Sequence, residues 1–125
     1  GQLAVFCNAP AIKSTTDNLI TDIIGTFRLL FGAFSIVGGK INDVGISLGA
    51  LNALPVALLV LGIGLSLGGP TGYAINPARD LGPRIMHFIL PIKNKRDSDW
   101  GYSWIPVVGP IIGGVIAALV FRIIQ

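Results

Sequence analysis

Long uncharged stretches alternate with short polar segments along this chain of 125 residues. No charged side chain occurs in residues 44–78 or in residues 103–121, and each stretch exceeds the roughly 18 residues that indicate a membrane-spanning helix. A third apolar segment has the length of a span but carries Asp22 and Arg28, which lower its hydrophobicity. The pattern predicts three spans, at about residues 18–38, 48–68 and 103–124.

The segment after the second predicted span is too short for another crossing. Gly68–Gly72 predicts a break in helicity, and Asn76 followed by Pro77 predicts a new helix start, because asparagine is a preferred N-cap and proline suits the first turn. About 15 residues of helix before Pro91 would extend about 22 Å, less than a hydrocarbon core of about 30 Å. We therefore predict a re-entrant loop and half-helix over about residues 69–90, lining a watery cavity or buried in protein.

Polar segments predict how the helices are joined. Residues 1–17 are predicted to form a loop, with a helix cap near Thr16 or Asp17. Residues 38–47 are predicted to form a short polar turn. Pro55 is predicted to lie inside the second span, where membrane helices tolerate proline.

Composition agrees with a membrane protein, since 52% of the residues are hydrophobic, 12% are charged and 17 are glycine. The net charge of +3 comes partly from Lys93, Lys95 and Arg96, which have no base-reading aromatic residues around them. Cys7 is the single cysteine, so an intrachain disulfide and a multi-cysteine metal site are excluded. His87 has no second metal-binding side chain near it in sequence. We expect a lipid bilayer around the chain, and no nucleic acid, metal or cofactor.

Polar groups in the predicted re-entrant segment are candidates for solute contact. Arg79 would cost about 2.5–3.5 kcal/mol at membrane depth, so it should face water or a partner. Asn76 can donate its side-chain amide at the positive end of a helix. The backbone carbonyls of Gly72, Tyr73 and Ala74 cannot all be satisfied by a helix, which makes them candidate acceptors along a lumen. The structural alternatives are a simple cap for Asn76 and an ion pair for Arg79.

The run Asn76-Pro77-Ala78-Arg79 resembles the motif of the major intrinsic protein family, the aquaporins and glycerol facilitators, whose two Asn-Pro-Ala motifs meet at mid-membrane. Two spans, a re-entrant half-helix and one more span resemble the second half of a family member over nearly the whole chain. The chain has one copy of the motif, whereas a complete member is an inverted repeat. The resemblance implies an all-α, aquaporin-like second half-repeat over residues 1–125, with the N-terminal half missing.

The same resemblance assigns a selectivity filter to Gly64, Tyr73 and Arg79. A glycine leaves volume, an aromatic ring offers an apolar wall, and a guanidinium donates hydrogen bonds, so together they imply a preference for polyols. Each of the first two has a structural alternative. Gly64 could serve helix packing only, and Tyr73 could be an interfacial aromatic residue.

Further positions match the glycerol-facilitator branch of the family. These markers are Asp80, Arg84, Pro106 and Val107. The first two also lie four residues apart on a helix, where opposite charges can pair. By resemblance, Asp22 corresponds to an embedded glutamate that braces the re-entrant loop, and its side chain is one methylene shorter.

These features imply a passive plasma-membrane channel for glycerol, related small neutral polyols and water, excluding ions and protons, when completed by the missing N-terminal half. A homotetramer is implied by the resemblance alone. A phosphate-binding enzyme is disfavoured, since no Gly-Lys-Ser/Thr ending follows the glycines near Gly64. The open alternative is a non-conducting membrane fragment that needs another half to assemble. The sequence assigns no role to Arg28.

Overall fold

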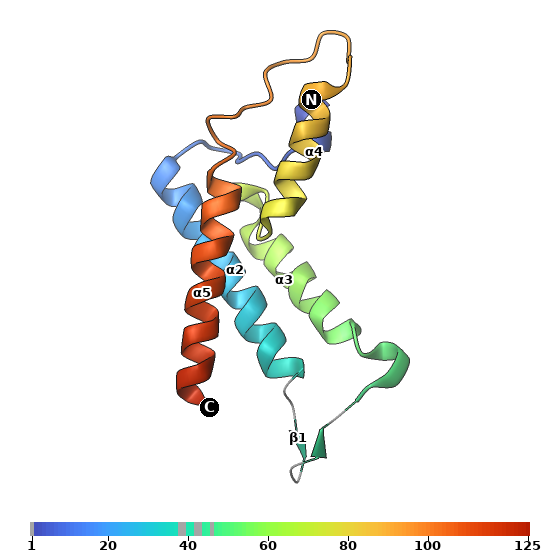
Figure 1. The fold of residues 1–125 in the computed structure, drawn as a ribbon, viewed down its shortest axis with the longest axis vertical. Coiled ribbons are helices and arrows are strands. Elements are labelled where there is room, and N and C mark those ends of the chain that lie inside the picture. The colour runs from blue at the N-terminus through green and yellow to red at the C-terminus, as the bar shows by residue number, and fades with distance from the viewer. Residues whose placement is uncertain (1, 38–39, 42–43, 46) are drawn as a thin grey trace.

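Three long helices lying side by side form the body of the protein (Figure 1). The computed structural model describes residues 2–37, 40–41, 44–45 and 47–125. The long helices are α2 (Thr15–Val37), α3 (Leu54–Thr71) and α5 (Ile105–Ile124), and α2 packs against both α3 and α5. Each is long and apolar enough to cross a membrane, with α3 counted together with the turn before it. The predicted all-α membrane fold with three spans is confirmed.

A fourth helix, α4 (Pro77–Ile89), is only 13 residues long and lies at one end of the bundle (Figure 1). Its length of about 20 Å is too short to cross a hydrocarbon core. The chain leaves α3, turns back through residues 72–76 and enters α4, which is the predicted re-entrant arrangement. The segment before α2 and the loop before α5 lie at the same end of the molecule as α4.

The connecting segments contain elements that the sequence did not predict. A short helix, α1 (Gln2–Phe6), lies within the segment predicted to be a loop. Between α2 and α3, β1 (Lys40–Ile41) pairs antiparallel with β2 (Val44–Gly45), and a single 3-10 turn, η1 (Gly49–Leu51), follows. The predicted polar turn at 38–47 falls partly on residues 38–39, 42–43 and 46, outside the described residues.

The bounds of α3 differ from the prediction at both ends. The helix begins at Leu54, so Pro55 lies in its first turn and not in its interior. Proline is favoured there because the first N–H groups of a helix have no intrahelical partner. The predicted break from Gly68 is wrong, since the helix continues to Thr71. It ends at Gly72, whose left-handed φ of 69° and N–H bond to the Gly68 carbonyl close the last turn.

Glycines on α5 allow it to cross α2 closely. A Cβ atom at Gly109 would lie 3.0 Å from the Cβ atom of Asp22, and one at Gly113 would collide with the backbone carbonyl of Ile23. Small residues at a membrane helix crossing let two backbones approach and gain van der Waals contact. The crossing therefore brings Asp22 into the interior of the protein.

We expect Gly113→Ala to lower the stability by about 1–3 kcal/mol, because the Ile23 carbonyl can move away only if α2 and α5 separate. Gly114→Ala is the matched control. Among the residues that the structure describes, its added Cβ would meet only the end of the Leu30 side chain, at 3.0 Å, and this end can rotate away. Thermal unfolding of the purified variants in detergent measures both effects. Equal losses in the two variants would contradict the close crossing at Gly113.

Candidate functional site

The N-terminus of α4 is capped by the first residue of the Asn-Pro-Ala motif. Asn76 has extended backbone angles, φ −156° and ψ 121°, and its side-chain oxygen accepts the Ala78 N–H at 2.9 Å. Pro77 occupies the first turn, where its missing N–H costs no hydrogen bond. Since the oxygen of Asn76 is used by the cap and the residue is exposed, its side-chain NH₂ group can donate outwards.

The loop between α3 and α4 has an uncommon backbone. Tyr73 and Ile75 have φ values of 42° and 44°, in the left-handed region that residues other than glycine rarely adopt. Ala74 between them is completely buried. Among the described residues, no hydrogen bond reaches the carbonyls of Gly72 or Ala74, while the Tyr73 carbonyl accepts one from Arg79. Two of the three carbonyls predicted to be acceptors along a lumen are thus without a partner in the described chain, and the one on the half-buried Gly72 is the more accessible.

The three predicted filter residues lie together. The guanidinium carbon of Arg79 lies 4.2 Å from the centroid of the Tyr73 ring, and one guanidinium nitrogen donates to the Tyr73 carbonyl. On its α3 side the ring packs against Gly64 and Gly68, where an added Cβ would lie 3.3 Å from ring atoms. The aromatic ring therefore stands between a glycine surface and a cation, in a cation–π arrangement.

An open groove of about 380 Å³ borders the Tyr73 ring along α3. Its walls are mainly apolar, and they are formed by Ala57, Val60, Leu61, Gly64, Leu65 and Tyr73. Arg79 is exposed in this chain. Because a charge in contact with lipid is costly, its side chain must face water or a partner in the membrane. The region thus combines an apolar wall with an exposed hydrogen-bond donor.

Asp22 on α2 reaches the re-entrant loop in spite of its short side chain. The residue is 1% exposed, and one carboxylate oxygen accepts the Ile75 N–H at 3.0 Å. The other oxygen has no hydrogen-bond partner among the described residues and lies against Gly109. The absence of a side chain at Gly109 leaves room for this second oxygen, since a Cβ atom there would lie 3.1 Å from it.

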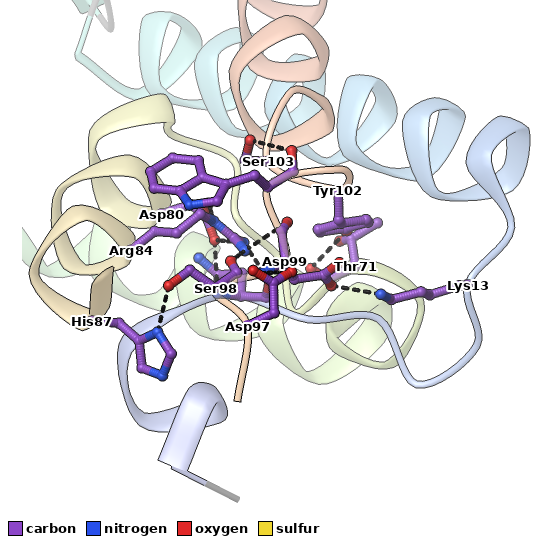
Figure 2. Close-up of polar contacts among 12 residues, drawn as sticks. Lys13, Thr71, Asp80, Arg84, His87, Asp97, Ser98, Asp99, Tyr102 and Ser103 are labelled. Atoms are coloured by element: carbon purple, nitrogen blue, oxygen red, sulfur yellow. Dashed lines mark hydrogen bonds and ion pairs between the residues drawn. The ribbon is translucent and has the colours of Figure 1, made fainter. Parts of the chain in front are cut away.

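Asp80 and Arg84 form a buried ion pair one turn apart on α4 (Figure 2). The carboxylate oxygens lie 2.7 and 2.8 Å from the Arg84 Nε and Nη2 atoms, a two-point contact. Arg84 also donates to the carbonyls of Ser98, Asp99 and Asn8 at 2.6, 3.1 and 3.2 Å. The Asn8 N–H donates back to Asp80 at 2.8 Å. The pair therefore ties α4 to the N-terminal segment and to the loop before α5.

Two side chains to which the sequence assigned no part in the site, His87 and Lys95, secure the C-terminal end of α4. The His87 ring is fully buried, and its Nδ1 atom lies 2.7 Å from the Ser98 hydroxyl (Figure 2). Lys95 donates to the carbonyls of His87, Phe88 and Leu90 at 3.2, 2.6 and 2.9 Å. The sequence offered one signal for the Lys95 contacts. Lys95 follows Ile89 by six positions, and cations near the end of a helix stabilise its last carbonyls.

The remaining predicted residues lie away from the Tyr73 ring. Pro106 is buried and Val107 half-buried in the first turn of α5. Arg28 is exposed on α2, beside an open groove of about 520 Å³ between α2 and α3. Among the described residues, no group of three or more His, Cys, Asp or Glu side chains could hold a metal ion.

The Major intrinsic protein family model matches residues 2–121. The chain is 58% identical over 121 residues to a probable glycerol uptake facilitator protein of Thermotoga maritima and 56% identical over 121 residues to a glycerol uptake facilitator protein of Streptococcus pneumoniae. Each alignment covers 97% of this chain and 49% of the relative. A D/L-lactic acid transporter of Lactiplantibacillus plantarum is 46% identical over 115 residues, which are 91% of this chain and 45% of that protein. The chain spans about half the length of these curated relatives.

Fold, motif and similarity agree. Three apolar helices and a half-helix that begins after Asn76 form the arrangement expected of a multi-pass membrane protein. The family consists of channels and transporters and is in general not enzymatic. Because the family model covers nearly the whole chain, this protein belongs to the major intrinsic protein family.

Proposed function

We propose that this chain forms the C-terminal half of a passive plasma-membrane channel for glycerol, related small neutral polyols and water. The observation that carries the proposal is the packing of Tyr73 between Gly64 and Arg79. It presents an aromatic wall and a guanidinium donor at one place, which suits a molecule with a carbon chain on one side and hydroxyls on the other. The names of the curated relatives in Thermotoga maritima and Streptococcus pneumoniae support glycerol as the solute.

Arg79 would select for hydroxyl groups and against cations. One of its guanidinium nitrogens is engaged with the Tyr73 carbonyl, and the planar group retains further N–H donors for two adjacent hydroxyls. Its positive charge repels cations in a narrow passage. The carbon backbone of the solute would lie on the Tyr73 ring, and Gly64 keeps that ring close to α3.

Asn76 and the Gly72 carbonyl would guide the solute through the rest of the passage. The NH₂ group of Asn76 donates to a hydroxyl or water oxygen, while the positive end of α4 disfavours cations and protons. The carbonyl of the half-buried Gly72 would accept hydrogen bonds from the same molecules, whereas Ala74 is completely buried, so its carbonyl lies out of their reach. Donors and acceptors thus replace the hydration of a neutral solute.

A second half would supply the opposite wall of this passage. The chain carries one Asn-Pro-Ala motif, and the groove beside Tyr73 is open. We infer an N-terminal half with a second motif, joined into the same protein, and assembly of the complete channel as a homotetramer. The half by itself leaves donors, acceptors and apolar groove walls without a partner.

The test is glycerol and water permeability of proteoliposomes, followed by stopped-flow light scattering. The 125-residue chain is compared with a channel in which it is joined to an N-terminal half. We expect glycerol and water to pass only through the joined channel, and we expect no ion current from it. Glycerol flux through the short chain alone would show instead that two copies of this half assemble into a pore. A joined, folded channel without glycerol flux would overturn the proposed function.

A further inference from the structure

The end of α3 is held by three different parts of the chain. The last carbonyls of a helix have no intrahelical partner. Here the Gly69 carbonyl accepts the Ala11 N–H at 3.0 Å, and the Pro70 carbonyl accepts the Asn18 side-chain amide at 2.6 Å. The Tyr102 hydroxyl lies 3.5 Å from the third carbonyl, that of Thr71 (Figure 2). The point at which the chain leaves α3 is therefore set by contacts from outside the helix.

Asn18 makes the shortest of these contacts and is 2% exposed. Its side-chain oxygen accepts the Ser14 N–H at 2.9 Å, which caps the start of α2. Its side-chain nitrogen donates to the carbonyls of Pro70 and Ile12, the second at 3.2 Å. Both hydrogens of the amide are used, so this buried group is fully matched to its surroundings.

Asn18 and Asp22 act on the two ends of the same loop. They are four residues apart on α2 and so lie on one face of the helix. Asn18 holds the Pro70 carbonyl before the loop, and Asp22 holds the Ile75 N–H after its bend. The Asn18 amide and the Asp22 carboxylate, on successive turns of α2, thus fix the start and the end of the six-residue segment 70–75.

The segment between these two contacts carries the strained backbone and the filter aromatic. Tyr73 and Ile75 both have positive φ values. Residues other than glycine remain in such conformations only where the surrounding structure holds them there. The position of the Tyr73 ring against Gly64 therefore depends on both ends of the loop being held.

We propose that Asn18 is a positioning residue for solute selectivity. By holding the Pro70 carbonyl it keeps the Tyr73 ring against α3 and so sets the width of the passage beside Arg79. Without the amide, the Pro70 carbonyl loses its hydrogen-bond donor. Because an unpaired buried carbonyl is costly, the last turn of α3 shifts to bring this carbonyl to a different donor. This inference rests on the proposed function, because its readout is the discrimination between polyols.

Substitutions at Asn18 test the inference in the joined channel. Asn18→Ala removes both the cap and the donor. Asn18→Asp keeps an oxygen for the Ser14 N–H, so the cap remains, but it replaces the donor with a second oxygen that repels the Pro70 and Ile12 carbonyls. Thr21→Ala is the matched control, since within the described part of the chain the Thr21 hydroxyl bonds only to the Asp17 carbonyl of its own helix. The measured quantity is the ratio of glycerol to xylitol permeability, normalised to the amount of folded channel.

We expect both Asn18 variants to lower this ratio about tenfold, because the free energy of one buried hydrogen bond corresponds to a factor of about ten. Thr21→Ala should keep the wild-type ratio. A residue with a merely structural role would lower the amount of folded channel and leave the ratio unchanged. An unchanged ratio in either folded Asn18 variant therefore overturns the inference, while glycerol flux through the wild type keeps the proposed function. Asn18→Ser, whose hydroxyl is too short to reach Pro70, gives the same comparison if the other two variants do not fold.

Discussion

A Gly64→Val channel should conduct glycerol at least about tenfold more slowly than the wild-type channel. A Cβ atom at Gly64 would lie 3.3 Å from two atoms of the Tyr73 ring, and the two methyl groups of valine would extend further into the ring. Overpacking of this kind costs about 1–3 kcal/mol, and relief requires the ring to move into the passage. Stopped-flow light scattering on proteoliposomes with the joined channel measures the glycerol permeability.

Gly62→Val is the matched control for this substitution. Gly62 lies on the same helix, and an added Cβ there would meet no atom of the described residues within 4 Å. Both variants carry the same cost in helix propensity. Gly62→Val should therefore retain most of the glycerol permeability. If the two variants lose permeability equally, the effect comes from α3 as a whole and not from the Tyr73 ring.

Arg84→Met should cause the largest loss of stability, about 3–5 kcal/mol, because it leaves the Asp80 carboxylate buried without its partner. The substitution also removes the donors to the carbonyls of Asn8, Ser98 and Asp99, so α4 would lose hydrogen bonds to the N-terminal segment and to the loop before α5. Folded yield in the membrane and thermal unfolding in detergent measure the effect. A double variant with Asp80→Leu should recover part of the loss, since no lone charge remains buried.

The ion pair between Lys13 and Asp99 is the control for this prediction. Its atoms are as close, 2.6 Å, but the Lys13 side chain is 58% exposed. Exposed pairs contribute about 0–1 kcal/mol because water screens the charges. Lys13→Met should therefore change the unfolding temperature little. An Arg84→Met channel as stable as Lys13→Met would mean that the buried pair does not hold α4 in place.

Local signals account for the features that the sequence predicted correctly. The three spans follow from the length of uncharged stretches, because a membrane core excludes charge over a fixed thickness. The start of α4 follows from Asn76 and Pro77, since capping depends on neighbouring residues only. The grouping of Gly64, Tyr73 and Arg79 was expected from the family resemblance and not from any periodicity in the chain.

The end of α3 shows where local signals were insufficient. Two glycines and a proline predict a break after Gly68, yet the helix continues to Thr71. Its last carbonyls, which have no partner within the helix, find donors on Ala11, Asn18 and Tyr102, which lie far away in the sequence. Long-range hydrogen bonds of this kind override a weak helix propensity.

The sequence by itself determined the membrane class, the three spans, the short α4 helix and the motif at its start. Each of these depends on hydrophobic length or on residues within one turn of each other. Only the tertiary structure decided that Asn18 holds the Pro70 carbonyl at the end of α3 and that His87 and Lys95 secure the C-terminal end of α4. All three are ordinary polar residues in the sequence. Asn18 and His87 gain their importance from burial beside a carbonyl and a hydroxyl of other segments, and the half-buried Lys95 gains it because its loop returns to the last carbonyls of α4. An unsatisfied polar group is costly only once the fold has excluded water from it.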